Sequence, residues 1–344
     1  MRRRVPFGCL IWATACLINP AQAVPTLPSN SAASSRIGLE GLNITILRAQ
    51  VLLDRAGFGP GVLDGRKGRF FSTALAGFQH ARGLPVTGQL DAASQAALRL
   101  DTGATIIRMT LKEDAFRALF TPDIPARIHD QAALPYLGYR NLLEKLAERF
   151  HTTPQTLLTM NPALATPRAG MALLLPGILP ANRDYPETLS AEWREMLATL
   201  NIDAVQPKAK KIVVDKSESV LKVYDDQEKL VAQFPATLGS AFDPLPLGDW
   251  VVKGAAFMPT YHYSPDLFWD ADSSDAKATL KPGPNSPVGV VWIDLNIPHY
   301  GIHGTPEPSR IGRSQSHGCV RLSNWDAARL AQMISPATPA VFQL

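Results

Sequence analysis

Cys319 is the residue in this chain with the clearest capacity for covalent chemistry. It follows His317 and Gly318, precedes Arg321, and has a second histidine, His303, a short distance upstream. A thiol attacks efficiently only as the thiolate, so it needs a lowered pKa or a base that takes its proton. Either histidine could be that base. The cluster therefore predicts a cysteine nucleophile.

The residues on both sides of the cysteine suit acyl transfer. Gly318 lets the backbone approach a bound carbonyl closely, so that N–H groups beside Cys319 can stabilise an oxyanion. Arg321 offers a fixed cation that can bind a carboxylate through two hydrogen bonds. These features predict a substrate that has a reactive carbonyl and a carboxylate.

Two other interpretations of the same residues are open. A lone cysteine can be a buried apolar filler, and a lone histidine is often a hydrogen-bonded structural residue. Alternatively, His299, His303, His317 and Cys319 have the ligand types of a zinc site, although the paired spacings typical of structural zinc are absent. The joint occurrence of all the parts favours the nucleophile, and we expect no metal and no cofactor.

A mainly β region has to position these residues. From residue 208 to the end of the chain, short apolar runs alternate with turns and Pro-rich loops, which is typical of strands. A helix is expected over 325–334, with Ser323 or Asn324 as its N-cap. The strands are expected over 211–214, 221–224, 229–237, 248–253 and 288–294.

The region before it divides into small helical units. Apolar residues at helical spacing, broken by glycine-rich turns, predict a three-helix bundle over 43–101. A second unit over 133–178 is expected to hold two helices, an opening strand at 134–139 and a closing strand. Residues 179–207 form a connector with one short helix. The predicted fold class is therefore multidomain α+β.

The motif around the cysteine resembles the signature of the L,D-transpeptidase family, whose catalytic domain is called YkuD-like. That signature is an upstream His-Gly pair, then Ser-His-Gly-Cys, then Arg. It stands in this chain as His303-Gly304, Ser316 to Cys319, and Arg321. The resemblance extends over the C-terminal domain, 208–344, and implies a mainly β, sandwich-like fold with a C-terminal helix.

The resemblance also implies a role for each residue of the motif. Cys319 is the expected nucleophile, His303 its base, and the carbonyl of Gly304 the group that orients the base. His317 is expected to shape the pocket, and N–H groups around Gly318 and Cys319 to hold the oxyanion. The residues expected to contact the substrate are Arg321 and Ser316 of the motif, together with Tyr261 and Tyr263, which are chosen only for their position in the long loop before it.

The implied activity is that of an acyltransferase acting on peptidoglycan. Such an enzyme cleaves the bond before the terminal D-Ala of a tetrapeptide stem, holds the stem as a thioester and transfers it to an amine. The product is a 3-3 cross-link, or a lipoprotein attached to the wall. The expected partners are therefore the stem peptides and glycan of the wall. An L,D-carboxypeptidase, which is a hydrolase of the same fold, and a non-catalytic peptidoglycan-binding protein are the alternatives.

Both upstream units resemble wall-binding modules. In 43–101, Leu63-Asp64-Gly65, Phe78-Gln79 and Gly83-Leu84 resemble the three-helix peptidoglycan-binding domain. In 133–178, two short helices and a closing strand resemble a LysM module. These resemblances imply that the enzyme is held on its polymeric substrate.

The beginning of the chain predicts export. A basic start, an apolar stretch and a small-x-small cleavage site give 1–23 the layout of a signal peptide, and a flexible leader follows over 24–42. Cys9 and Cys16 lie in that signal, so Cys319 is the only cysteine of the mature protein. We expect a periplasmic protein that contacts the membrane only if Cys16 is lipidated.

The net charge argues against nucleic acid as a partner. The chain carries +4 at pH 7, and Arg2–Arg4 supply three of these charges in a segment without acids. The mature protein is therefore near +1, far from the basic surface that nucleic-acid binding requires.

Overall fold

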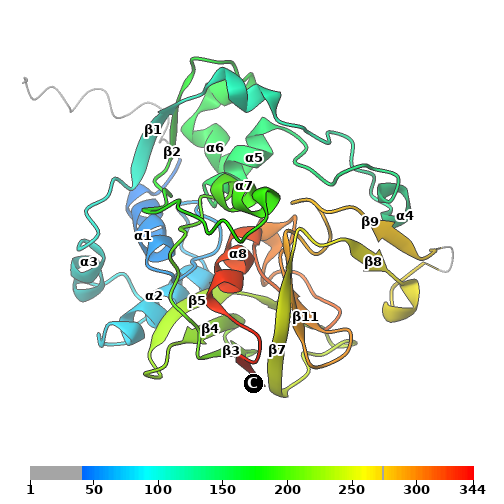
Figure 1. Ribbon diagram of the computed structural model, residues 1–344. Helices are drawn as coiled ribbons and strands as arrows, with labels where there is room; N and C mark the ends of the chain where they lie inside the picture. Colours follow the sequence, from blue (N-terminus) through cyan, green and yellow to red (C-terminus); the bar gives the residue numbers. More distant parts are fainter. Residues whose placement is uncertain (1–40, 273–274) are drawn as a thin grey trace, which may run out of the picture. The chain divides into compact units, whose positions relative to one another are not determined.

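A computed structural model describes residues 41–272 and 275–344 of the chain (Figure 1). The predicted signal peptide, 1–23, lies outside the described residues, as does all of the predicted leader except residues 41 and 42. Within the described residues, no helix has both the length and the apolar character needed to cross a membrane.

One nine-stranded sheet is the framework of the C-terminal region, as the mainly β pattern predicts. Its strands are β3 (Lys211–Asp215), β4 (Val220–Tyr224), β5 (Leu230–Pro235), β6 (Thr237–Leu238), β7 (Gly248–Phe257), β10 (Val291–Leu295), β11 (Gly301–His303), β12 (Val320–Arg321) and β13 (Pro339–Gln343). The strand order is β5-β4-β3-β13-β7-β10-β11-β12-β6. The pairs β3–β13 and β11–β12 are parallel, and the other pairs are antiparallel.

The strand predicted over 229–237 divides at Ala236. Its two parts, β5 and β6, are separated by that residue but stand at opposite ends of the strand order. The sheet must therefore curl until its two edges approach each other, around a core that includes Val214, Phe234 and Ile293. This curl pairs β6 with β12 and brings it beside the cysteine motif.

The predicted C-terminal helix packs on this sheet. Helix α8 (Asn324–Met333) contacts β10 and β11 and buries Trp325 (red in Figure 1). Ser323 is its N-cap, and the Ser323 hydroxyl accepts a hydrogen bond from the backbone N–H of Asp326 at 3.1 Å. The helix therefore begins where the sequence predicts.

The three helices predicted over 43–101 also form, as α1 (Ile44–Arg55), α2 (Arg69–Ala81) and α3 (Ala92–Leu98). The side-chain oxygen of Gln79 is buried and accepts hydrogen bonds from two backbone N–H groups at 2.8 Å each, in the turn before α3. Gln79, one of the residues that carry the family resemblance, therefore has a structural task.

This helical unit lies against the edge of the sheet. Helix α2 packs on β5, and the backbone of Gln233 in β5 exchanges hydrogen bonds with Gly57 and Gly59 at 2.9 and 2.8 Å. The segment after α1 thus covers an edge strand whose backbone groups would otherwise be unpaired.

A second unit combines two strands and two helices. Its elements are β1 (Ile106–Thr110), α5 (Leu142–Arg149), α6 (Pro154–Met160) and β2 (Ala172–Pro176). The strands β1 and β2 pair in antiparallel fashion. The opening strand expected over 134–139 does not form, because the partner of β2 lies much earlier in the chain.

The segment between β1 and α5 explains this difference. After η1 (Glu113–Arg117) and α4 (Ile128–Gln131), the chain reaches the hairpin of β8 (Tyr261–Tyr263) and β9 (Ala278–Leu280). The N–H of Leu137 donates to the carbonyl of Pro282 at 3.0 Å, and the N–H of Asn285 donates to the carbonyl of Leu137 at 2.9 Å. The apolar run therefore packs on the C-terminal region instead of forming a strand.

The connector predicted over 179–207 is not a free linker. Its helix α7 (Ala191–Thr199) buries Trp193, whose ring stacks on Phe257 of β7 with 4.6 Å between ring centroids. Three short 3-10 helices complete the described elements, at η2 (Pro162–Ala165), η3 (Pro265–Leu267) and η4 (Pro308–Arg310).

Candidate active site

The pairing of β11 with β12 unites the two halves of the cysteine motif. Ile302 lies opposite Val320 and His303 opposite Arg321 in this parallel pair, and Cys319 immediately precedes β12. Two segments that are separated along the chain thus present the histidine, the cysteine and the arginine on one side of the sheet.

His303 is held as a neutral imidazole. The ring is buried, its Nδ1 lies 2.7 Å from the carbonyl of Gly304, and it stacks on Trp292 of the neighbouring strand. Burial lowers the pKa of His303 to about 3, with a further lowering from the cation of Arg321. Because a carbonyl only accepts hydrogen bonds, Nδ1 carries the proton and Nε2 keeps a free lone pair. The ring is therefore ready to take a proton.

Cys319 is a protonated thiol in this environment. Burial raises the pKa of the Cys319 thiol, although the N–H of Gly301 and the cation of Arg321 oppose that shift. The thiol approaches the carbonyl of His299, with 3.7 Å between sulfur and oxygen. A thiol of this kind depends on a nearby base, and His303 lines the same cavity.

That cavity has a volume of about 670 Å³ and is bounded on one side by β8 and the segment that follows it. Tyr261 and Phe268 of the hairpin segment line it, together with Cys319, His303 and Arg321. Burial raises the pKa of Tyr261 to about 12, so its phenol stays neutral. The volume lies in the range of small-molecule binding sites.

Two glycines of the motif have no room for a side chain. Gly318 has a φ of +87°, and a Cβ there would lie 2.2 Å from the Tyr300 ring. A Cβ on Gly304 would lie 2.2 Å from the side-chain oxygen of Asn324. The first glycine permits the turn into the cysteine, and the second lets Asn324 approach the segment that orients His303.

The structure places two predicted substrate contacts away from the cavity. The Ser316 hydroxyl is buried, accepts from the N–H of Gly239 at 2.6 Å and donates to the carbonyl of Cys319 at 2.7 Å. Tyr263 is also buried, and its hydroxyl donates to Asp275 at 3.0 Å. Ser316 therefore holds the cysteine loop and Tyr263 supports the hairpin, because their polar atoms already have partners inside the protein.

His317 is part of the cavity wall. Its Nε2 lies 2.7 Å from Asp270, and its ring packs edge-on against Phe268. Both partners belong to the segment between β8 and β9, so His317 fastens that segment to the cysteine loop.

The zinc interpretation finds no support in the geometry. Across residues 41–272 and 275–344, no group of three or more His, Cys, Asp or Glu side chains is arranged to hold a metal ion.

The sequence patterns did not point to two residues that support this site, Trp292 and Asn324. Trp292 stacks on His303 from β10, and the side chain of Asn324 donates to Pro284 and accepts from the N–H of Val290, at 3.0 and 3.1 Å. The alternation of the predicted strand over 288–294 could have placed Trp292 on the sheet face, but nothing local distinguishes Asn324 from an ordinary helix cap.

Comparison with known proteins gives the following matches. Residues 209–342 match the family model described as "L,D-transpeptidase catalytic domain". Residues 45–98 match the model described as "Putative peptidoglycan binding domain". The protein named "Putative L,D-transpeptidase YkuD" from Bacillus licheniformis is 28% identical over 198 residues, which is 57% of this chain and 90% of that protein.

Two solved structures resemble the chain weakly. An L,D-transpeptidase from Mycobacterium smegmatis is 21% identical with a TM-score of 0.32, over 39% of this chain and 58% of that one. The chain thus spans less than two thirds of the mycobacterial chain. An L,D-transpeptidase from Xylanimonas cellulosilytica is 15% identical with a TM-score of 0.35, over 87% of this chain and 93% of that one.

Proposed function

Because residues 209–342 form an L,D-transpeptidase catalytic domain and 45–98 a peptidoglycan-binding domain, we propose that this protein is a peptidoglycan L,D-transpeptidase with Cys319 as its nucleophile. The observation that carries the proposal is a neutral, oriented His303 in the same cavity as a protonated Cys319 and the cation of Arg321. This arrangement suits attack on a carbonyl beside an anionic group.

The first half of the reaction transfers the stem to the enzyme. Nε2 of His303 takes the proton of the Cys319 thiol while sulfur attacks the carbonyl of the third stem residue. N–H groups around Gly318 and Cys319 stabilise the oxyanion. When the intermediate collapses, the bond to the terminal D-Ala breaks, and its nitrogen takes the proton from His303. The stem is left as a thioester.

The second half returns the enzyme to its starting state. An acceptor amine attacks the thioester, His303 takes a proton from that amine, and the departing sulfur recovers a proton as the new amide forms. The carbonyl of Gly304, 2.7 Å from Nδ1, keeps the ring in the required tautomer throughout. Arg321 binds a carboxylate of the stem and so places its carbonyl near the sulfur.

Hydrolysis by the same site is the second candidate. With water as the acceptor, the enzyme would be an L,D-carboxypeptidase, and the motif residues would have the same roles. The third candidate, a non-catalytic wall-binding protein, has less support, because such a protein has no need of a neutral histidine oriented beside a lone thiol.

The upstream units support a wall-bound enzyme. We propose that the peptidoglycan-binding domain, together with the LysM-like unit that contains α5 and α6, tethers the enzyme to the polymer and raises the local concentration of stems. The signal-like residues 1–23 support export to the periplasm, where this substrate lies.

Mass spectrometry of the intact protein tests the proposal. The mature chain is incubated with a disaccharide-tetrapeptide, and protein and products are analysed in parallel. We expect a thioester adduct on Cys319 and a cross-linked dimer. An adduct with only tripeptide would support the carboxypeptidase, whereas a folded protein that gives neither adduct nor product would overturn an enzymatic function.

A further inference from the structure

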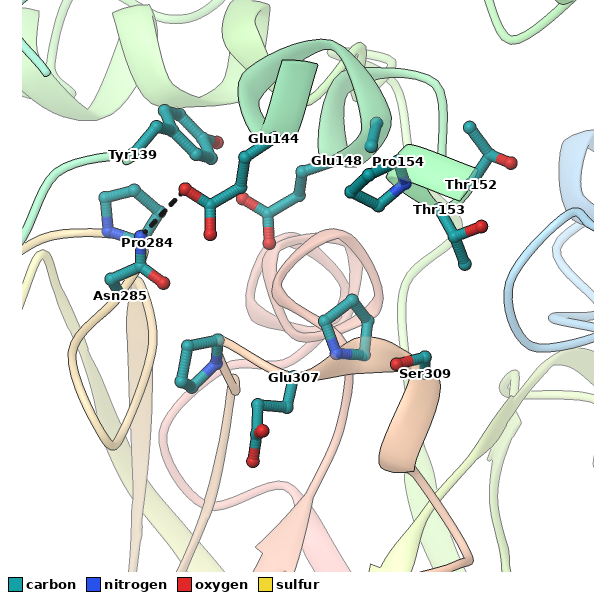
Figure 2. Close-up of a pocket in the computed structure, with 13 residues that line it drawn as sticks. Tyr139, Glu144, Glu148, Thr152, Thr153, Pro154, Pro284, Asn285, Glu307 and Ser309 are labelled. Carbon is teal, nitrogen blue, oxygen red and sulfur yellow. Dashed lines mark hydrogen bonds between the residues drawn. The ribbon is translucent and has the colours of Figure 1, made fainter. Parts of the chain in front are cut away.

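A second, smaller cavity lies between α5 and two loops of the catalytic domain (Figure 2). Its volume is about 180 Å³, and none of its lining residues is shared with the cavity of Cys319. The charged residues that line it are all acidic, namely Glu144, Glu148 and Glu307.

Two of the three carboxylates already have cationic partners. Glu144 pairs with Arg140 at 2.9 Å, and Glu307 pairs with Arg310 at 3.2 Å. Figure 2 also shows the Glu307 carboxylate directed away from the other two. Of these three carboxylates, only Glu148 has no cation within ion-pair distance among the described residues.

Glu148 is nevertheless the most deeply buried of the three. Its side chain is only 7% exposed, and its Oε1 accepts a hydrogen bond from the amide of Asn324 at 2.8 Å. Burial raises the pKa of Glu148 to about 7, even though neighbouring Tyr139 and Asn324 favour the ionised form. A buried carboxylate without a counter-ion is costly, and a bound cation would remove that cost.

The free polar atoms of this cavity suit such a cation. Among the described residues, Oε2 of Glu148 and the hydroxyl of Tyr139, a residue that is 6% exposed, have no hydrogen-bond partner apart from each other. Figure 2 shows the Glu148 carboxylate directed into the open space. A carboxylate oxygen and a hydroxyl oxygen side by side can accept two of the three hydrogens of an ammonium group.

We infer that this cavity binds a primary ammonium group at the end of an unbranched alkyl chain, with Glu148 as its counter-ion. The volume is below the usual range for whole ligands, so the cavity suits an end group, not a disaccharide-peptide. Pro154, Pro284 and Pro308 give it apolar walls for the alkyl chain. The described acidic residues do not form a metal site.

Two sources could supply this group. A lysine side chain ends in a methylene and an ammonium, whereas a diaminopimelate side chain carries a carboxylate beside its amine. Because Glu144, and Glu148 once it holds the ammonium group, would repel a second carboxylate, we expect the cavity to favour the lysine type.

Calorimetric titration of the full protein with n-butylammonium tests the inference, with n-butanol as the uncharged control. We expect saturable binding of the amine and no binding of the alcohol. Glu148→Gln should weaken amine binding by about tenfold or more, because it removes the counter-ion but keeps an amide-sized side chain. Glu307→Gln, which changes a paired carboxylate of the same cavity, should alter the affinity by less than about twofold.

A further variant and two further ligands distinguish the remaining outcomes. Tyr139→Phe should weaken binding severalfold even if Glu148→Gln proves unstable in thermal unfolding. If the wild type, Glu148→Gln and Tyr139→Phe bind the amine equally, the amine binds elsewhere, for example in the Cys319 cavity, and the inference is overturned. Binding of n-butanol as tight as that of n-butylammonium would also overturn it. Nα-acetyl-lysine amide compared with diaminopimelate then identifies the source of the group. Each of these experiments measures binding alone, so its result does not depend on whether Cys319 forms an acyl-enzyme.

Discussion

Two buried histidines in this protein meet opposite environments. Among the described residues the His303 ring has one hydrogen-bond partner, the carbonyl of Gly304, and the residue lines the catalytic cavity. His151, between α5 and α6, has Asp54 of α1 at 3.0 Å from Nδ1 and the carbonyl of Leu200 at 2.9 Å from Nε2. Both ring nitrogens of His151 therefore have partners inside the protein, and neither is left free for a substrate.

His151 belongs to a charged junction, which we define as Asp54, His151 and Arg329. Arg329 of α8 lies 2.6 Å from Asp54, and the His151 ring stacks on Trp325 of the same helix. Burial alone would raise the pKa of Asp54, but Arg329 and His151 hold that pKa well below its usual range. The junction joins both upstream units to the catalytic domain.

The comparison shows that surroundings, not residue type, decide what a histidine does. Within the described part of the chain, the catalytic cavity leaves one nitrogen of His303 without a hydrogen-bond partner, whereas the junction gives both ring nitrogens of His151 a partner inside the protein. Changes in the first region should therefore affect turnover, and changes in the second should affect stability.

The largest effect is expected at the nucleophile. Cys319→Ala should lower turnover of disaccharide-tetrapeptide by about 10⁴-fold or more, because no other group can form the thioester. The variant should still sediment with insoluble peptidoglycan and unfold at the wild-type urea concentration. Retained turnover would remove Cys319 from the mechanism.

The next effect is expected in the junction. Arg329→Met leaves the buried carboxylate of Asp54 without its main cation, so urea unfolding should show a loss of about 3–5 kcal/mol. Arg310→Met, which breaks the exposed pair with Glu307, should cost at most about 1 kcal/mol. Equal losses in the two variants would mean that the junction does not hold the units together.

A smaller effect on stability and an effect on turnover should coincide at Asn324, whose side chain contacts both Glu148 of α5 and the segment of Gly304. Asn324→Ala removes hydrogen bonds to Glu148, Pro284 and Val290, and we expect a cost of about 2–3 kcal/mol. It also removes the side chain that packs on Gly304, so turnover by the folded fraction should fall about tenfold. Unchanged turnover would show that His303 is oriented without this support.

The smallest effect is expected from pH. Because the pKa of His303 is about 3, the base is neutral from pH 8 to pH 5, and the acylation rate should change by less than about threefold across this interval. A rate that halves near pH 6.5 would contradict a neutral, buried base.

Circular dichroism should accompany each point of that profile. The unfolded chain binds a proton at His303 near pH 6.5, whereas the folded protein binds it only near pH 3. This histidine therefore lowers stability as the pH falls between these values, and loss of folded protein must be separated from loss of rate.

Local sequence patterns predicted much of the fold. The three helices of 43–101, the capped helix α8 and most strands of the sheet appear where apolar spacing and cap residues predict them. The His-Gly and Ser-His-Gly-Cys segments likewise pointed to His303 and Cys319 as a predicted base and nucleophile, and both residues line one cavity. The side-chain periods of strands and helices, 2 and 3.6 residues, extend over only a few positions, as do helix caps. These signals can therefore be recognised in a single sequence.

Tertiary structure decided what depends on distant partners. The division of the 229–237 strand at Ala236, the pairing of β2 with β1 and the burial of Ser316 and Tyr263 follow from which segments meet across the fold. The unpaired carboxylate of Glu148 is likewise visible only once α5 packs on the catalytic domain. Sequence alone determined which groups can react. Only packing decided which of them stay free, because the partner of a buried polar group often comes from a distant part of the chain.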